Sequence, residues 1–276
     1  MKQFRSMSYP YVVWITVLIV VPMLLIVGYA FTVNGTDLLD FQFTLDNFQK
    51  FFQDTVFLEV LIRSLRVALI TTVLCLLLGY PAAYIIANAL GKNKFVLIML
   101  VTLPTWINML VRTYAWVGIL QKDGLLNTVL GFFGIAPMEL MYTDTAVIIG
   151  MVYNFIPFMI LQIYTALTKM DHALIEAAAD LGANRVMCFL KVTFPLSLPG
   201  VISGITLVFL PAVSSFFIPK LLGGGSYMLI GNVIESQFLT VGNWSFGSAI
   251  SLIMAVIIMI SMYITRRVDK NGGENA

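Results

Sequence analysis

Six stretches of this chain contain no Asp, Glu, Lys, Arg or His, and each is long enough to cross a lipid bilayer. A helix needs roughly 20 apolar residues to span a hydrocarbon core about 30 Å thick. Only 11% of the residues are charged, whereas soluble domains carry roughly 25%. The chain is therefore predicted to be an all-α integral membrane protein. Its six transmembrane helices are expected within residues 6–36, 67–91, 95–111 (resuming at 113 after Arg112), 145–168, 194–219 and 236–265.

The distribution of basic residues predicts the orientation of these spans. An even number of crossings puts both termini on one side, and Lys and Arg concentrate in cytoplasmic loops. Most of the basic residues lie on the side of the termini: Lys2, Arg5, Lys92, Lys94, Lys169, Arg185, Lys191, Arg266, Arg267 and Lys270. Both termini are therefore predicted to be cytoplasmic.

The composition of the connections divides the chain into three parts. Residues 1–62 are predicted to be an N-terminal transmembrane helix with an acidic outer loop, in which residues 44–52 form a short amphipathic helix. Residues 63–265 form a transmembrane domain of five helices, with a short helix expected in the outer loop 121–144 and a re-entrant or surface element near residues 221–238. Residues 266–276 form a polar tail, whose composition predicts disorder.

The inner connection 169–199 is the one compact helical stretch expected in water. Asp171 is a good N-cap, and the Ala-rich run that follows favours a helix until Gly182 stops it. Asn184 is expected to cap a second helix, which should end at Pro195 because proline cannot continue the backbone hydrogen bonds. The first helix has an apolar stripe formed by Leu174, Ala177, Ala178 and Leu181, while Glu176 and Asp180 share another face. Such a helix is suited to a groove in another protein.

Three features of this connection are similar to a known signature. Glu-Ala-Ala at 176–178, Gly182, and FPLSLPG at 194–200 resemble the cytoplasmic loop of permease subunits of binding-protein-dependent ABC importers. Phe194 before Pro195 stands where many relatives carry an aliphatic residue. The resemblance implies the type I ABC importer permease fold, in which this loop forms a coupling helix that fits a cleft in an ATPase subunit. The residues expected to make that contact are Glu176, Ala177, Ala178, Asp180 and Gly182.

Four longer stretches resemble the polyamine permeases of the same family. They are LGYPAAYIIA (78–87), LPTWINMLVRTYAW (103–116), AVIIGMVYNFIPFMILQIYTAL (146–167) and LIGNVIESQF (229–238). The resemblance implies import of spermidine or putrescine across a bacterial cell membrane. It also implies a second permease subunit, two ATPase subunits that bind ATP and Mg, and an extracytoplasmic binding protein. A permease for another small solute and a secondary carrier remain alternatives.

The chain lacks the residues that would let it supply energy or chemistry itself. No Asp, Glu or His falls within a predicted span, although ion-coupled carriers normally need an intramembrane ionisable group. There is no G-x-x-x-x-G-K-[ST] or H-E-x-x-H sequence, and two Cys with one His make no metal site. We therefore expect no enzymatic activity, no cofactor or metal in this chain and no nucleic-acid partner. Energy must enter through a cytoplasmic contact.

Six residues are candidates for the translocation path. Aromatic faces attract amine cations by roughly 0.5–2 kcal/mol each, which suits Trp106, Tyr114 and Tyr153 to a polyamine. Asn108 and Asn154 either line the path or bond between helices. Glu235 either faces the mouth of the path or is an ordinary loop carboxylate. Arg112, near the outer boundary, either reaches lipid head groups or pairs with an outer acid such as Glu235.

Overall fold

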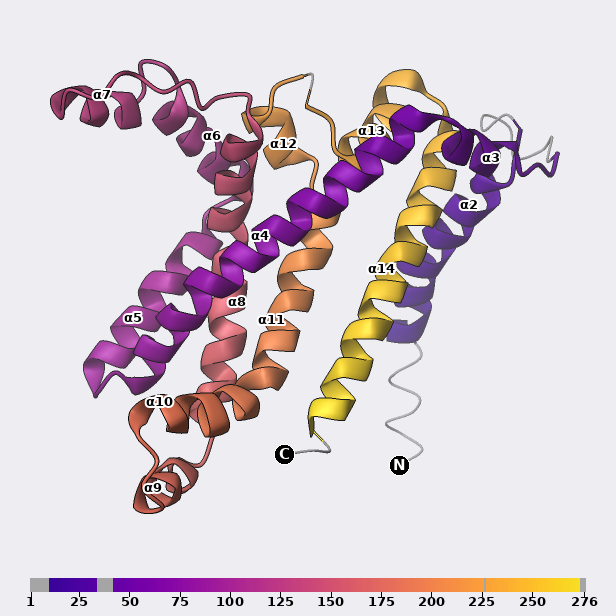
Figure 1. Cartoon of the computed structure of the whole chain (residues 1–276). Helices are drawn as coiled ribbons and strands as arrows, with labels where there is room; N and C mark the ends of the chain where they lie inside the picture. The colour runs from indigo at the N-terminus through magenta and orange to yellow at the C-terminus, as the bar shows by residue number, and fades with distance from the viewer. Residues whose placement is uncertain (1–9, 34–41, 226, 274–276) are drawn as a thin grey trace, which may run out of the picture. The chain divides into compact units, whose positions relative to one another are not determined.

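The computed structural model describes residues 10–33, 42–225 and 227–273, and it is built from helices (Figure 1). The only β-type pairing in this part of the chain is an isolated bridge between Thr32 and Phe43. A helix satisfies every backbone hydrogen bond within one segment, which a bilayer demands because it offers no water. The chain clusters into two compact units. The first comprises Met1–Leu61 and Ile230–Met259, and the second comprises Ile62–Leu229 and Ile260–Ala276.

Five of the six predicted spans are continuous helices of sufficient length and hydropathy among the described residues. They are Pro10–Ala30, Thr55–Asn88, Asp144–Lys169, Arg185–Ser214 and Trp244–Thr265. The remaining span is broken, with Lys92–Trp106 and Met109–Phe132 bent by 95°. It contains α5 (Lys92–Thr102), the 3-10 turn η2 (Leu103–Trp106), α6 (Met109–Leu120) and α7 (Leu125–Phe132). The count of six spans thus holds when the bent pair is taken as one.

The bend has a local cause at Pro104 and the residues after it. Pro104 lies in the first turn of η2, and Ile107 adopts an extended backbone with ψ 137°. A new helix then begins at Met109, and its N-cap is Asn108. Because the chain leaves the helical conformation at Ile107, the hydrogen-bond ladder of α5 cannot pass into α6.

The first unit contains the first span and most of the last one. It contains η1 (Thr16–Val20), α2 (Val21–Ala30), α3 (Asp46–Gln53), α13 (Ile230–Ser236), η4 (Gln237–Val241) and the first part of α14 (Trp244–Gly273). Phe51 of α3 is fully buried, and its ring stacks on Phe57 at 6.1 Å. Phe57 in turn meets Phe246 edge-on at 5.0 Å. The predicted amphipathic helix near residue 48 is therefore confirmed as a helix, held by aromatic packing.

The second unit is organised around the pair α8 (Asp144–Lys169) and α11 (Phe194–Ser214), which lie side by side (Figure 1). Two glycines in α11 allow the close approach. A Cβ added at Gly200 would lie 2.5 Å from the Ala166 Cβ and 2.8 Å from the Gln162 carbonyl oxygen, and one at Gly204 would lie 2.6 Å from the Met159 sulfur. Glycines four residues apart are typical of tightly packed membrane helices.

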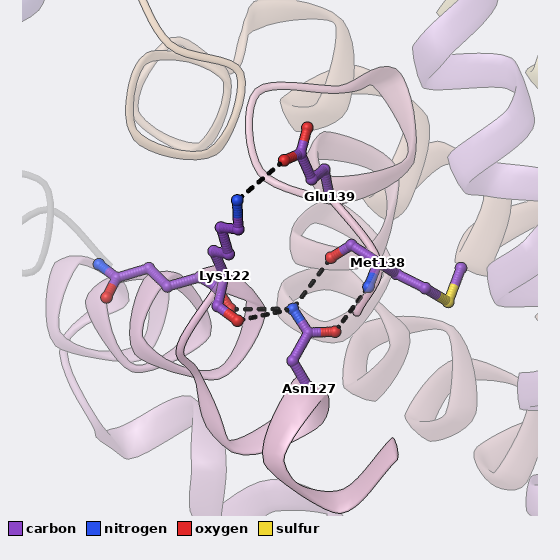
Figure 2. Close-up of polar contacts among 5 residues, drawn as sticks. Lys122, Asn127, Met138 and Glu139 are labelled. Atoms are coloured by element: carbon purple, nitrogen blue, oxygen red, sulfur yellow. Dashed lines mark hydrogen bonds and ion pairs between the residues drawn. The ribbon is translucent and has the colours of Figure 1, made fainter. Parts of the chain in front are cut away.

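The predicted short helix between the third and fourth spans is confirmed as α7. Figure 2 shows how Asn127, a buried residue of α7, holds the loop together. Its Nδ2 donates to the carbonyl oxygens of Gln121, Lys122 and Met138 at 3.0–3.3 Å, and its Oδ1 accepts from the Met138 N–H at 2.8 Å. Lys122 and Glu139 form an exposed ion pair at 3.5 Å, which contributes little because solvent screens it. The hydrogen bonds of the Asn127 side-chain amide therefore stabilise this loop more than the ion pair does.

Two expectations about helix ends are wrong. The helix after Asn184 does not stop at Pro195, because η3 (Phe189–Thr193), a π-helical turn, carries the chain into α11. Pro195 then sits in the first turn of α11, where a missing N–H costs little. The tail expected to be disordered is helical up to Gly273. No proline interrupts α14 there, and the helix continues although Asp269, Asn271, Gly272 and Gly273 are weak helix formers.

The element around residues 221–238, expected to be re-entrant or superficial, consists of short helices. α12 (Phe217–Leu222) precedes a glycine-rich turn, and α13 follows that turn. Neither of these helices is long enough to cross a membrane.

The packing of α11 on α8 predicts that Gly200→Ala destabilises the protein. The new methyl group would meet backbone atoms that cannot move aside independently, and overpacking of this kind costs about 1–3 kcal/mol. The midpoint of thermal unfolding of the purified protein should therefore fall. Gly118→Ala in α6 is the matched control, because nothing lies within 4 Å of its added Cβ. Equal melting temperatures for the two variants would contradict this account of the α8–α11 contact.

Candidate functional site

The candidate site is the connection between α8 and α11, residues 169–199, which we call the elbow. It contains α9 (His172–Asp180), α10 (Arg185–Cys188) and η3, and it runs into the first turn of α11. Within the second unit, α9 and α10 lie beyond the ends of α8 and α11, at the opposite end from α7 (Figure 1). A protein that contacts α9 from this end therefore need not touch the sides of α8 or α11.

Both predicted N-caps of the elbow are confirmed. The Asp171 carboxylate accepts from the Ala173 N–H at 3.0 Å, and the Asn184 side chain accepts from the Met187 N–H at 2.8 Å. Each bond satisfies a backbone donor that a helix start would otherwise leave without a partner. The two short helices are thus each fixed at their first turn.

Gly182 forms the turn between these helices in the way its position predicted. Its φ is +84°, in the left-handed region that glycine adopts without strain. The Gly182 N–H donates to the Ala179 carbonyl at 2.9 Å, and the Ala183 N–H donates to the Ala178 carbonyl at 3.1 Å. These two bonds make a Schellman motif. The elbow therefore turns by a defined, hydrogen-bonded geometry.

The residues predicted to contact an ATPase lie on the surface of the elbow. Glu176, Ala177, Asp180 and Gly182 are exposed, and Ala178 is half-buried. The Glu176 carboxylate makes no hydrogen bond or ion pair with the residues that the structure describes. Leu181 is 90% exposed. Leu181 follows Asp180 at the end of α9, so its side chain lies on the same exposed part of the elbow.

An aromatic cluster that the sequence did not predict supports the base of the elbow. Phe189 of η3 meets Tyr80 and Tyr84 of α4 (Thr55–Asn88) edge-on at 5.8 and 5.6 Å, and Phe194 lies 5.7 Å from Tyr80. The Tyr80 hydroxyl and the Ser197 hydroxyl are hydrogen-bonded at 2.8 Å in a buried position. Aromatic pairs of this geometry add about 0.5–1.5 kcal/mol each. The elbow is thereby fixed to α4 as well as to α11.

Three of the candidate path residues lie at the bend between α5 and α6. Trp106 and Tyr114 are 75% and 59% exposed. The Asn108 side chain accepts from the Leu110 N–H at 2.8 Å and so caps α6. The hydrogen bond that the structure shows for this amide is within its own segment, and its path-lining role stays a prediction. The bend creates a helix start within the span, and that start needs an acceptor.

Two further candidates lie in the middle of α8. Asn154 is 1% exposed, and its Nδ2 donates to the Gly150 carbonyl of its own helix at 2.8 Å. The neighbouring Tyr153 is half-buried and meets Trp116 edge-on at 5.4 Å. Asn154 thus forms no hydrogen bond to another helix among the described residues. It is covered by protein in this conformation.

The remaining charged candidates belong to helices outside the elbow. Arg112 is half-buried on α6, and its Nε and Nη1 meet no acceptor in the part of the chain that the structure describes. Glu235 is half-buried on α13 of the first unit.

Cys75 and Cys188 are buried free thiols. Among the described residues, no three His, Cys, Asp or Glu side chains gather in a way that could hold a metal ion.

Comparisons with known proteins find similar proteins over almost the whole chain. The family model described as "Binding-protein-dependent transport system inner membrane component" matches residues 2–271. "Spermidine/putrescine transport system permease protein PotB" of Haemophilus influenzae is 41% identical, over 93% of this chain and 91% of the relative. The Escherichia coli protein of the same name is 38% identical, over 93% and 94% of the two chains.

Solved structures extend the similarity to the fold. A chain of a bacterial ABC transporter involved in the import of the acidic polysaccharide alginate has a TM-score of 0.75 at 20% identity, covering 96% of both chains. The same kind of transporter in complex with an alginate pentasaccharide-bound periplasmic protein gives 0.76, covering 97% of this chain and 95% of that one. The helical architecture is therefore the type I ABC importer permease fold. Together with the family match over almost its whole length, this architecture shows that the chain belongs to the inner-membrane permeases of binding-protein-dependent ABC importers.

Proposed function

We propose that this chain is the membrane-spanning permease subunit of an ATP-driven importer that moves spermidine and putrescine into the cytoplasm. The observation that carries the proposal is the identity of 38–41%, over 93% of the chain, to permeases named for spermidine and putrescine transport. The exposed aromatic rings of Trp106 and Tyr114 are consistent with a cationic amine cargo. A cation entering a negative interior also gains about 2.3 kcal/mol per charge per 100 mV.

The importer would contain three further kinds of protein. A second permease subunit would complete the path as a heterodimer, and two ATPase subunits would bind the ATP and Mg that this chain does not hold. An extracytoplasmic binding protein would deliver the cargo, as a periplasmic protein is seen to join the alginate transporter. Both termini and the elbow would then face the cytoplasm, where the basic residues concentrate.

The elbow is the proposed point at which ATP-driven motion enters the chain. Closure of the two ATPases would push on α9, with Ala177 and Ala178 allowing close approach and Glu176 and Asp180 making polar contacts. Gly182 would hold the turn between the two short helices. Such a device needs stiffness, which is supported by the Schellman hydrogen bonds and by the aromatic cluster.

The same geometry supports a route for the motion beyond the elbow. The π turn η3 continues into α11, while the Tyr80–Ser197 hydrogen bond connects α11 to α4. Gly200 and Gly204 hold α11 against α8. A displacement of α9 would therefore move α4, α8 and α11 together, which is the rigid-body motion that alternating access requires.

Import of another small solute is the second candidate. The fold alone does not decide the cargo, because the alginate importer carries a polysaccharide on a closely similar permease. Only the residues that line the path would differ between the two candidates.

Gly182→Val and Glu176→Lys are predicted to abolish uptake while the protein still reaches the membrane. Valine is strained at φ +84°, and lysine would reverse the charge of the proposed ATPase contact. Uptake and ATPase activity are measured on the reconstituted importer, with Gly134→Val and Glu139→Lys as matched controls. Gly134 has a similar φ of +73°, and Glu139 is 79% exposed, both in the loop that holds α7. Normal uptake by both elbow variants would refute the coupling role.

The cargo proposal predicts ATP-dependent accumulation of labelled spermidine in vesicles that contain the complete importer and its binding protein. Unlabelled putrescine should compete, whereas a neutral diol of equal length should not, because only protonated amines gain from aromatic faces and the membrane potential. Uptake is measured by filtration with and without ATP. If an importer that hydrolyses ATP accumulated a different solute and no spermidine, the result would contradict the polyamine proposal and support import of another small solute.

A further inference from the structure

A groove of about 380 Å³ in the second unit combines polar and apolar side chains from three helices. Its volume is in the range of small-molecule sites, roughly 300–1,000 Å³. The polar side chains come from α8, α11 and the last part of α14, and the apolar walls come from α11 and α14. They are Gln162, Ser203, Thr206 and Thr265, with Leu207 and Met262 as walls.

The groove runs from the elbow-side part of α8 to the middle of α11, where Thr206 lies just beyond the midpoint of the helix. Gln162 lies seven residues before Lys169, the last residue of α8, which is about 10 Å at 1.5 Å per residue. Ser203 lies nine residues after Phe194, the first residue of α11, which is about 13 Å. The groove therefore extends from about the middle of α11 toward the elbow.

The polar groups of the groove do not bond the helices to one another. The Thr206 hydroxyl donates to the Ile202 carbonyl at 2.9 Å, and the Thr265 hydroxyl donates to the Ser261 carbonyl at 2.7 Å. Both acceptors belong to the donor's own helix. The side chains of Gln162 and Ser203 form no hydrogen bond with the residues that the structure describes. Inter-helix bonding, the usual reason for polar groups at this depth, therefore does not explain the set.

The hydrogen-bond state of these groups favours a donor as ligand. A hydroxyl that has given its hydrogen to a carbonyl keeps only its lone pairs, so Thr206 and Thr265 present acceptors to the groove. Gln162 adds an amide oxygen beside its own N–H donors, and the Ser203 hydroxyl can donate or accept. An alkylammonium group carries three donors and no acceptor, as the lysine ammonium does. Leu207 and Met262 provide apolar surface for the methylene chain of such a ligand.

We propose that this groove is a transient subsite for a protonated alkylamine on its way through the importer. The inference rests on the proposed function only in taking the cargo to be a cationic amine. The described lining contains acceptors but no carboxylate, so the amine is held by neutral groups and leaves readily. Conduction through a membrane requires binding of this kind, favourable enough for entry and weak enough for release.

The test measures the reactivity of Ser203→Cys in the assembled importer in nanodiscs, with both native cysteines replaced by alanine. After correction for the rates with free cysteine, the cationic reagent aminoethyl methanethiosulfonate should react about tenfold faster than its anionic sulfonatoethyl analogue, because charged hydrogen bonds contribute at least that factor. Spermidine should slow the cationic reaction. Equal corrected rates, or no reaction with either reagent in the bilayer, would overturn the proposal.

Variants of the acceptors make the test specific. Thr206→Val combined with Gln162→Leu should reduce the cation preference to that of free cysteine. Thr165→Val on α8 is the matched control, because Thr165 is exposed, bonds its own helix at 2.7 Å and does not line the groove. An equal loss of preference in the control would overturn the assignment. If Ser203→Cys reacted faster with the cationic reagent but the importer took up no spermidine in vesicles, the groove would still be shown to bind alkylammonium groups. The proposal that spermidine is the cargo would then be rejected.

Discussion

The close approach of α11 to α8 at Gly200 and Gly204 is the contact on which the rest of the second unit depends. Here the two backbones come so near that an added Cβ would lie 2.5–2.8 Å from neighbouring atoms. Apolar burial gives no driving force between helices in lipid, so packing of this quality must supply it. α8 enters the elbow and α11 leaves it, and their contact fixes the position of both ends of the elbow.

The elbow adds local order to that fixed base. Its two side-chain caps and its Schellman turn leave few unsatisfied backbone groups in a segment that crosses no membrane. The cluster of Tyr80, Tyr84, Phe189 and Phe194 then joins it to α4. The consequence is a short segment that is held by contacts to three long helices, α4, α8 and α11. The groove that contains Gln162 and Thr206 lies on two of them, so the proposed drive and the proposed path share the same supports.

Sequence reasoning predicted the features that depend on local chemistry. Charge-free windows located the spans, and Asp171, Asn184 and Gly182 act as their residue types suggest. It failed at residue types that can either end a helix, bend it or let it continue. Pro195 was expected to end a helix, but a π turn before it lets the chain continue; Pro104, in contrast, precedes a 95° bend. The Tyr80–Ser197 bond and the polar groove join residues far apart in the chain, and no single-sequence pattern pairs them. The contacts of Asn127 are local, but they depend on how the loop between α6 and α8 folds back.

The most direct test of the central claim is a crosslink from the elbow to an ATPase subunit. Leu181→Cys, at a side chain that is 90% exposed, is treated in the assembled importer with a short bifunctional reagent, after both native cysteines have been replaced. The account predicts one adduct that contains this chain and an ATPase, with a yield that changes when ATP is added. Phe132→Cys, 87% exposed on α7, should give no such adduct. Failure of Leu181→Cys to reach any second polypeptide would contradict the account.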